Sequence, residues 1–266
     1  MNVFCFLHVG NSRENQEDNY MLGGQYLSPE HVDSMSKHRT LYYESKKISG
    51  GFCAAVSDGM GGYKCGEVAS LMTVKYLADH YNELLHTVET GKNELSNFVT
   101  RLNEYVCAEA KKRADTRNVG ATLCGVICHN ENTIGFNVGD SRLYRFSNGV
   151  LHQISVDNTE GQRLLRLCLL TEEEVRTFPK KKALYKYIGK DTRLIPDVYD
   201  LGNMRRGTVL LLCSDGLSDV LDLKEIQDIL SMRDVKTLDK GKILVEMAVG
   251  RKQGTGDNIT LILIED

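Results

Sequence analysis

The sequence lacks the features of a membrane or secreted protein. Its longest apolar runs, residues 208–213 and 259–264, have the length of a strand, whereas a helix that spans a bilayer needs roughly 20 apolar residues. Residues 1–9 carry neither a basic start nor a small-residue cleavage site, so a secretion signal is not expected. We therefore predict a soluble, cytoplasmic protein with no membrane partner.

The sequence also lacks an excess of positive charge and the cysteine spacing of a zinc site. Its 33 Lys and Arg face 36 Asp and Glu, and a net charge of -3 is not typical of a protein that binds nucleic acid. The eight cysteines include no CxxC pair. Most lie inside apolar runs and are predicted to be buried thiols in a reducing cytoplasm: Cys5, Cys53, Cys124, Cys128 and Cys213.

The chain does have enough apolar residues for a sizeable core, because 41% of its 266 residues are hydrophobic. No internal repeat or flexible linker divides it, so a single domain over residues 1–266 is the simplest expectation. Short runs rich in β-branched and aromatic residues predict enough strands for two sheets, at residues 3–9, 52–56, 122–128, 133–138, 143–146, 208–213 and 259–264.

Helical periodicity predicts pairs of helices between the groups of strands. Segments 66–88 and 95–110 would form a helical hairpin, and the second has one buried face: Leu95, Phe98, Val99, Leu102 and Val106. Another helix should run over residues 222–230, with Glu225 completing a capping box, and a fourth over residues 238–249.

Short turns between consecutive strands favour antiparallel hairpins over alternating strand and helix, so the predicted class is α+β with two packed sheets. These turns lie at residues 130–132, 140–141 and 147–149. Two polar segments, 25–50 and 157–201, fit this plan poorly. Both are predicted to be surface excursions, and the second is expected to be a flap.

Four aspartates lie at or beside predicted strand ends, each next to a glycine that would let the backbone turn sharply and approach an ion: Asp58, Asp140, Asp215 and Asp257. A single Asp-Gly pair usually marks only a turn. If the sheets bring these four to one edge, however, the carboxylates would repel one another unless a cation lies between them. Oxygen ligands without Cys or His suit Mg²⁺ or Mn²⁺ rather than zinc.

Six short motifs, in this order, resemble those of the protein phosphatase 2C family, also called the metal-dependent PPM phosphatases. They are RENQED at 13–18, DGMGG at 58–62, GAT at 120–122, VGDSR at 138–142, SDGL at 214–217 and DN at 257–258. Each alone is a weak signal, but together they extend over nearly the whole chain. The resemblance implies a β-sandwich of two antiparallel sheets flanked by paired helices, in α-β-β-α layers, with a metal cleft at one edge.

The resemblance also implies a set of metal ligands. Asp58 would bridge two ions, the carbonyl group of Gly59 would complete the second ion, and the first would be held by Asp215 and Asp257. Asp140, together with Asp215, would match the additional metal position of bacterial-type members. The expected cofactor is therefore Mn²⁺ or Mg²⁺, with two core ions and a third at Asp140.

Further roles follow from the same resemblance. Glu17 and Asp18 would orient metal-bound waters, and Arg13 would bind the substrate phosphate through two N–H groups. The alternative for Arg13 is a surface salt bridge to Glu17 or Asp18, which is the default for a lone arginine but is less expected inside this motif. Met60 stands where eukaryotic members often have a histidine regarded as a proton donor. The chain thus resembles a bacterial-type enzyme in which water would protonate the leaving group.

The predicted function is hydrolysis of phosphoserine and phosphothreonine on proteins by a metal-activated water, with Arg13, Asp58 and Asp215 as the catalytic residues. The expected partners are phosphoproteins that are targets of a cognate kinase, and the expected state is a monomer. Two alternatives remain open: a pseudophosphatase that binds phosphoproteins without turnover, and a di-metal phosphatase of a small phosphorylated metabolite.

Other residues near the motifs have ordinary explanations. Ser57 and Ser214 precede metal aspartates and are predicted to form hydrogen bonds at strand ends rather than to act as nucleophiles. The run of lysines at 180–182 could recognise acidic phosphoproteins, but a short charge run is usually a solvated face.

Overall fold

The computed structural model describes residues 1–61, 66–112, 119–130, 132–251 and 256–266. Gly62 of the DGMGG motif and Glu131 of a predicted turn lie outside these residues. Within the described ranges, no helix is long and apolar enough to cross a membrane.

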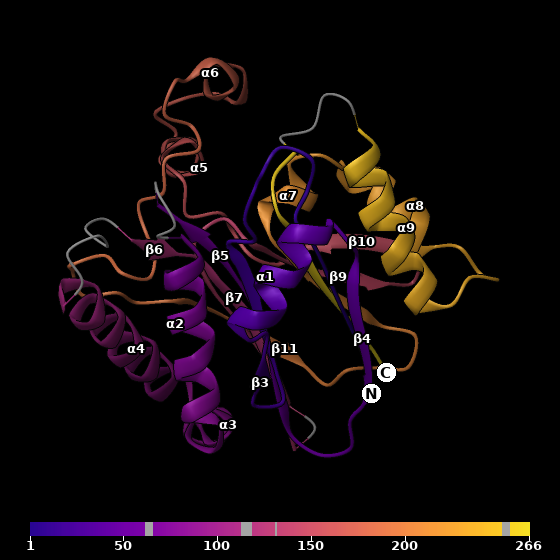
Figure 1. Ribbon diagram of the computed structural model, residues 1–266, viewed down its shortest axis with the longest axis horizontal. Coiled ribbons are helices and arrows are strands. Elements are labelled where there is room, and N and C mark those ends of the chain that lie inside the picture. Colours follow the sequence, from indigo (N-terminus) through magenta and orange to yellow (C-terminus); the bar gives the residue numbers. More distant parts are fainter. Residues whose placement is uncertain (62–65, 113–118, 131, 252–255) are drawn as a thin grey trace.

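The strands of the described chain form two antiparallel sheets (Figure 1). The first has the order β10-β9-β12-β13-β1-β4, with β1 (Asn2–His8), β4 (Tyr42–Lys47), β9 (Arg142–Ser147), β10 (Val150–Gln153), β12 (Val209–Cys213) and β13 (Ile259–Glu265). The second has the order β11-β8-β7-β5-β2-β3, with β2 (Asp18–Leu22), β3 (Gln25–Tyr26), β5 (Phe52–Met60), β7 (Leu123–His129), β8 (Asn132–Val138) and β11 (Asp197–Gly202). A short strand, β6 (Gly120–Ala121), also pairs with β5.

The side chains of each strand alternate between the two faces of its sheet, and this alternation produces the layers of the core. Successive side chains of a strand point to opposite faces, so Val3, Cys5 and Leu7 of β1 join a cluster shared with the second sheet, whereas Phe6 packs on the opposite side. Almost all of these apolar side chains are fully buried. The predicted α+β class with sheet-on-sheet packing is therefore confirmed.

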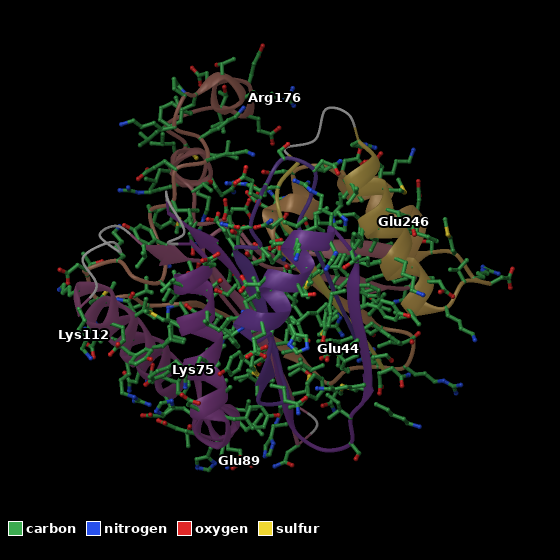
Figure 2. The ribbon with its side chains drawn as sticks, viewed as in Figure 1. Glu44, Lys75, Glu89, Lys112, Arg176 and Glu246 are labelled. Carbon is green, nitrogen blue, oxygen red and sulfur yellow. The ribbon has the colours of Figure 1, made fainter. Side chains whose placement is uncertain are left out.

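Helices cover both outer faces (Figure 1). On the second sheet lie α2 (Gly66–Asp79), α3 (Tyr81–Thr90) and α4 (Lys92–Lys112), and on the first lie α8 (Leu223–Leu230) and α9 (Thr237–Gly250). The five predicted face residues of α4 are all buried, and the capping box of α8 is present. Figure 2 shows charged side chains on the outer surface, such as Lys75 on α2, Lys112 on α4 and Glu246 on α9.

One helix prediction was wrong in its extent. The segment 66–88 is two helices, because the chain bends at His80, which adopts a non-helical backbone conformation. The bend allows α3 to bury Leu84 against the sheet. The apolar periodicity continues across the bend, so it carries no sign of the interruption.

The prediction that residues 25–50 form only a surface excursion was wrong. This segment contains β3, α1 (Pro29–His38) and β4, and β4 pairs along β1 as the edge strand of the first sheet. The helix buries Val32 and Met35. Edge strands commonly carry charged side chains, which explains why β4 has a polar sequence.

The segment 157–201 is a flap in its first part only. Its helices α5 (Glu160–Arg166) and α6 (Glu172–Thr177) project from the sandwich, and Arg176 lies at the far end of this projection (Figures 1 and 2). The last part is β11, which pairs with β8 and belongs to the second sheet.

Packing between α9 and β1 leads to a stability prediction. A Cβ atom at Gly241 would lie 2.2 Å from the ring of Phe6, which is fully buried. We expect Gly241→Ala to lower the free energy of unfolding by about 1–3 kcal/mol through overpacking, despite a gain of up to about 1 kcal/mol in helix propensity. Urea unfolding measures this change.

Gly250 of the same helix is the matched control, because among the described residues outside its own helix turn no atom lies within 4 Å of a Cβ placed there. Gly250→Ala should leave stability unchanged or raise it slightly. Equal effects at the two positions would contradict the packing argument.

Candidate active site

The acidic residues meet at one edge of the sandwich, where strand ends from both sheets come together. Asp18 and Asp58 lie directly opposite each other on β2 and β5. A cleft of about 410 Å³ at this edge is lined by all of the predicted metal and phosphate residues: Arg13, Asp58, Gly59, Asp140, Asp215 and Asp257. Glu17 also lines the cleft, together with Met60, Gly61, Thr122, Lys182 and Leu184.

A larger cavity, of about 470 Å³, lies at the opposite end of β5, around Gly51 and His129. None of the predicted site residues lines it. Because the predicted site residues line the smaller cleft, we take that cleft as the candidate active site.

The backbone of Asp58 is held in place by Thr122, which lies between β6 and β7. Strand β5 continues past the predicted end at residue 56, and the backbone N–H of Asp58 donates to Oγ1 of Thr122 at 2.9 Å. The N–H of Thr122 in turn donates to the carbonyl oxygen of Asp58 at 2.8 Å, and Oγ of Ser57 donates to the carbonyl oxygen of Thr122 at 2.7 Å. The hydrogen-bonding role predicted for Ser57 is confirmed.

The glycines beside the acids serve two different purposes. Gly139 and Gly256 have φ values of 110° and 64°, so they turn the backbone as predicted. Gly59 and Gly216 are needed for close approach instead. Their Cβ atoms would lie 2.0 Å from the first carbonyl oxygen of α2 and 1.9 Å from the carbonyl oxygen of Asn258, so no side chain fits.

Asp18 does not line the cleft, although it lies opposite Asp58, which does. Its side chain is buried, and Oδ2 accepts a hydrogen bond from Oγ of Ser214 at 2.7 Å. Ser214 Oγ accepts from the N–H of Thr260 at 3.0 Å, which ties the residue between β12 and β13. The predicted hydrogen-bonding role of Ser214 is confirmed, and Asp18 is held in one orientation.

The crowded acids resist ionisation. Burial, followed by the negative charges of Asp18 and Asp215, raises the pKa of Asp58 well above its ordinary range. Burial, with help from Asp215, raises the pKa of Asp140 to about 7. The pKa of Asp18 is raised to about 7 and that of Asp215 to about 6, again chiefly by burial.

A divalent cation would relieve this repulsion, and the donors, all oxygen atoms, suit Mg²⁺ or Mn²⁺. Gly59 also lines the cleft, and because no side chain fits between it, α2 and the carbonyl of Glu17, it could contribute only its backbone oxygen. Among the residues that the structure describes, however, no three acidic, histidine or cysteine side chains are already arranged as a metal-binding group. The residues fit a metal by their chemistry rather than by a preformed coordination shell.

Arg13 lies at the rim of the cleft with a half-exposed side chain. Nε and Nη2 donate to the two carboxylate oxygens of Asp257 at 2.7 and 2.8 Å, and Nη1 lies 3.8 Å from Glu17. An ion pair with Glu17, one of the alternative partners, is therefore present, but the main partner is Asp257, a predicted metal ligand.

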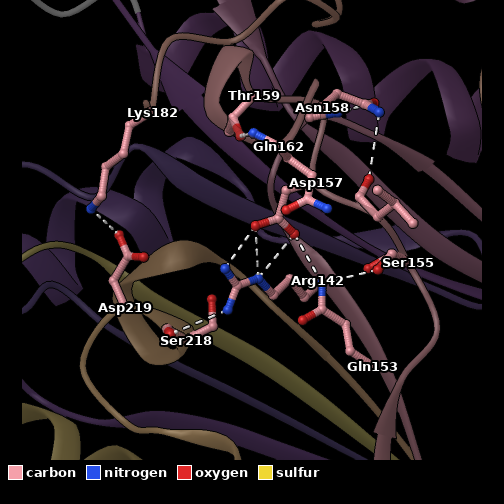
Figure 3. Close-up of polar contacts among 12 residues, drawn as sticks. Arg142, Gln153, Ser155, Asp157, Asn158, Thr159, Gln162, Lys182, Ser218 and Asp219 are labelled. Carbon is pink, nitrogen blue, oxygen red and sulfur yellow. Dashed lines mark hydrogen bonds and ion pairs between the residues drawn. The ribbon is translucent and has the colours of Figure 1, made fainter. Parts of the chain in front are cut away.

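The base of the flap is hydrogen-bonded to the segment that carries Asp140, and Figure 3 shows one of these contacts, between Asp157 and Arg142. The backbone N–H of Asn158 donates to the carbonyl oxygen of Gly139 at 2.8 Å, and Oδ1 accepts from the N–H of Gly139 at 3.0 Å. Arg142 of the VGDSR motif donates to Asp157 through Nε and Nη2, the latter at 2.7 Å. These contacts position Asp140 through the backbone.

Lys182 is a cleft residue that the sequence did not identify. It comes from the flap, forms an ion pair with Asp219 just after α7 (Asp215–Ser218), and lines the cleft near Asp140 (Figure 3). The lysine run was expected to be a solvated face, and Lys180, Lys181 and Lys182 are all exposed, but Lys182 also lines the cleft. No local pattern distinguishes the third lysine, because its position depends on how the flap folds back.

Comparisons with known proteins place this geometry in a family. A family model described as Protein phosphatase 2C matches residues 42–242. The serine/threonine phosphatase stp of Listeria monocytogenes is 33% identical over 213 residues, covering 79% of this chain and 82% of that protein. Protein phosphatase PhpP of Streptococcus pneumoniae is 30% identical over 210 residues, covering 79% and 83%. The chain belongs to the protein phosphatase 2C family.

Solved structures agree with this assignment. Stp1 of Staphylococcus aureus has a TM-score of 0.78 at 26% identity, with 99% of this chain and 94% of that chain covered. The catalytic domain of PstP in complex with 2 manganese ions has a TM-score of 0.70 at 26% identity, with 100% and 99% covered. The predicted family, its fold and the enzyme class, a metal-dependent serine/threonine protein phosphatase, are confirmed.

The raised pKa values predict how pH affects the metal-free protein. Asp18, Asp140 and Asp215 have pKa values of about 7, 7 and 6 instead of 3.8, so between pH 4 and 7 the folded state keeps protons that the unfolded chain has released. Stability should therefore fall as pH rises, by at least about 2 kcal/mol between about pH 5 and pH 8. Urea unfolding in EDTA tests this.

Asp140→Asn should weaken the pH dependence, because one of the shifted carboxyl groups is removed. Saturating Mn²⁺ should also weaken it if the acids bind the ion. A metal-free protein that is equally stable at both pH values would show that the acids are not crowded as described.

Proposed function

We propose that the chain hydrolyses phosphoserine and phosphothreonine monoesters on proteins with an activated water as the nucleophile. The observation that carries this proposal is the meeting of acids from both sheets in one cleft whose lining also includes the cations Arg13 and Lys182. The names of the bacterial relatives support phosphoproteins as the substrate class.

The acids of the cleft are the proposed metal ligands. Asp58, Asp215, Asp257 and the carbonyl oxygen of Gly59 would hold two Mn²⁺ or Mg²⁺ ions, and Asp140 with Asp215 would hold a third. When bound, such ions lower the pKa of a water molecule and neutralise charge on the phosphate. The relative solved with manganese supports this choice of cofactor.

The remaining roles belong to the protein's own side chains. Arg13 binds two phosphate oxygens once its guanidinium turns from Asp257 into the cleft, which its half-exposed position allows. Glu17 orients water from the cleft wall, and Asp18 does so from its buried position opposite Asp58, where its bond to Ser214 keeps it in place. Met60 offers no proton, so water protonates the leaving oxygen.

We also propose that residues 1–266 form one catalytic domain that acts as a cytoplasmic monomer on the targets of a cognate kinase. A core shared by both sheets, which includes β1 and β13, supports a single domain. The predicted buried thiols, such as Cys53 and Cys213, are buried and free, which supports a reducing compartment.

Metal removal is the first test of this function. Hydrolysis of a phosphothreonine peptide and of p-nitrophenyl phosphate should stop in EDTA and return with Mn²⁺ or Mg²⁺. Asp58→Asn should lower kcat by several orders of magnitude, roughly 10³-fold or more, because both core ions would lose their shared ligand. The measurement is steady-state kinetics with each substrate.

Asp79→Asn is the matched control, because this acid lies on α2 outside the cleft, paired with Lys75. It should leave kcat unchanged. Full activity in EDTA would overturn the metal mechanism, whereas metal-dependent binding of the peptide without turnover would favour a pseudophosphatase. Turnover of small phosphate esters alone would favour a metabolite phosphatase.

Asp140 provides a test that separates the third ion from the two core ions. Asp140→Ala should still bind two ions tightly, because it leaves Asp58, Asp215 and Asp257 in place, but should lose most of its turnover. Calorimetric metal titration beside phosphopeptide kinetics measures both properties. Wild-type turnover at saturating Mn²⁺ would make Asp140 only a turn residue.

A further inference from the structure

Arg39 holds the loop that carries Arg13. Its guanidinium donates three hydrogen bonds, each of 3.1 Å, to the carbonyl oxygens of Gly10, Asn11 and Arg13. These oxygens belong to the connection between β1 and β2. One side chain thus binds the backbone of this loop at three points, including the residue proposed to bind phosphate.

The same helical segment also contacts the far end of the loop. Ser36 of α1 accepts a hydrogen bond at its Oγ from the N–H of Gln16 at 3.0 Å and donates to the carbonyl oxygen of Val32 at 2.9 Å. On its other side, the loop is bound by Asn258, whose Nδ2 donates to the carbonyl oxygen of Asn15 at 3.0 Å. The loop therefore lies between α1 and the start of β13.

The backbone of Arg39 has an unusual conformation. It forms the C-cap of α1 with a φ of 49°, in the left-handed region, where its N–H donates to the carbonyl oxygen of Met35 at 2.8 Å. Glycine adopts this conformation without a steric penalty and is the common residue at such a cap. A strained non-glycine residue points to a use for its side chain, and here that side chain binds the loop.

We propose that Arg39 is a positioning residue for phosphate binding by Arg13. This inference rests on the proposed function, in which Arg13 binds the substrate phosphate. A bidentate contact depends on the placement of the guanidinium to within a fraction of an ångström. The three carbonyl contacts fix the backbone from which Arg13 extends, and α1 thereby contributes to the cleft without lining it.

Arg39→Gly separates positioning from folding. Glycine relieves the left-handed backbone while removing the three side-chain bonds, so the melting temperature should change little. We expect kcat/KM for a phosphothreonine peptide at saturating Mn²⁺ to fall about 10- to 100-fold. Arg39→Lys should recover only part of this loss, because an ammonium cannot reproduce the planar fork.

The decisive comparison uses Arg13→Ala. If Arg39 acts through Arg13, then Arg39→Gly should have little further effect on kcat/KM in the Arg13→Ala protein, because the residue being positioned is absent. Arg145→Ala is the matched control. Its guanidinium also binds a backbone carbonyl, that of Leu201 at 3.1 Å, between β9 and β11 and outside the cleft, so kcat/KM should be unchanged.

The outcomes distinguish this inference from the function on which it rests. Undiminished activity of Arg13→Ala would overturn the phosphate-binding role itself. A large loss for Arg13→Ala beside normal kcat/KM for Arg39→Gly would overturn only the positioning role. An equal loss from Arg39→Gly with and without Arg13 would also overturn it, because the effect would then be a general one on the fold.

Discussion

Repulsion among partly buried carboxyl groups is the constraint on which the active edge of this protein depends. Asp18 and Asp58 lie opposite each other on adjacent strands, and Asp215, the first residue of α7 after β12 of the other sheet, adds a third negative charge. Strand register maintains this arrangement, because a slip of one residue would turn Asp58 to the opposite face. The two sheets therefore form the core and also bring carboxyl groups from both sides to one edge, where these groups repel one another.

Hydrogen bonds from surrounding residues hold the acids in place despite this repulsion. Thr122 fixes the backbone of Asp58, Ser214 fixes the carboxylate of Asp18, and Asn158 fixes the turn before Asp140. Each of these groups lies far along the chain from the acid that it positions. The cleft is therefore a product of tertiary packing, and its geometry depends on both sheets being correctly paired.

Sequence reasoning identified the acids because their signals are local. Asp58, Asp215 and Asp257 stand beside glycines and apolar runs, and the motif order places them together. It missed Lys182 and Arg39 because their roles depend on contacts with distant segments, which no short pattern records. The polar edge strand β4 was missed for a related reason, since half of an edge strand faces water and lacks a continuous apolar run.

The attachment of the flap has a consequence for how such enzymes diversify. Residues at its base are bonded to the catalytic edge through Arg142 and Gly139, whereas the projecting tip exposes large apolar side chains such as Leu167 and Leu169. Mutations at the tip therefore alter the surface presented to an approaching protein while leaving the anchoring bonds intact. The exposed surface of the tip and the anchoring bonds at the base can consequently change independently within one continuous segment of chain.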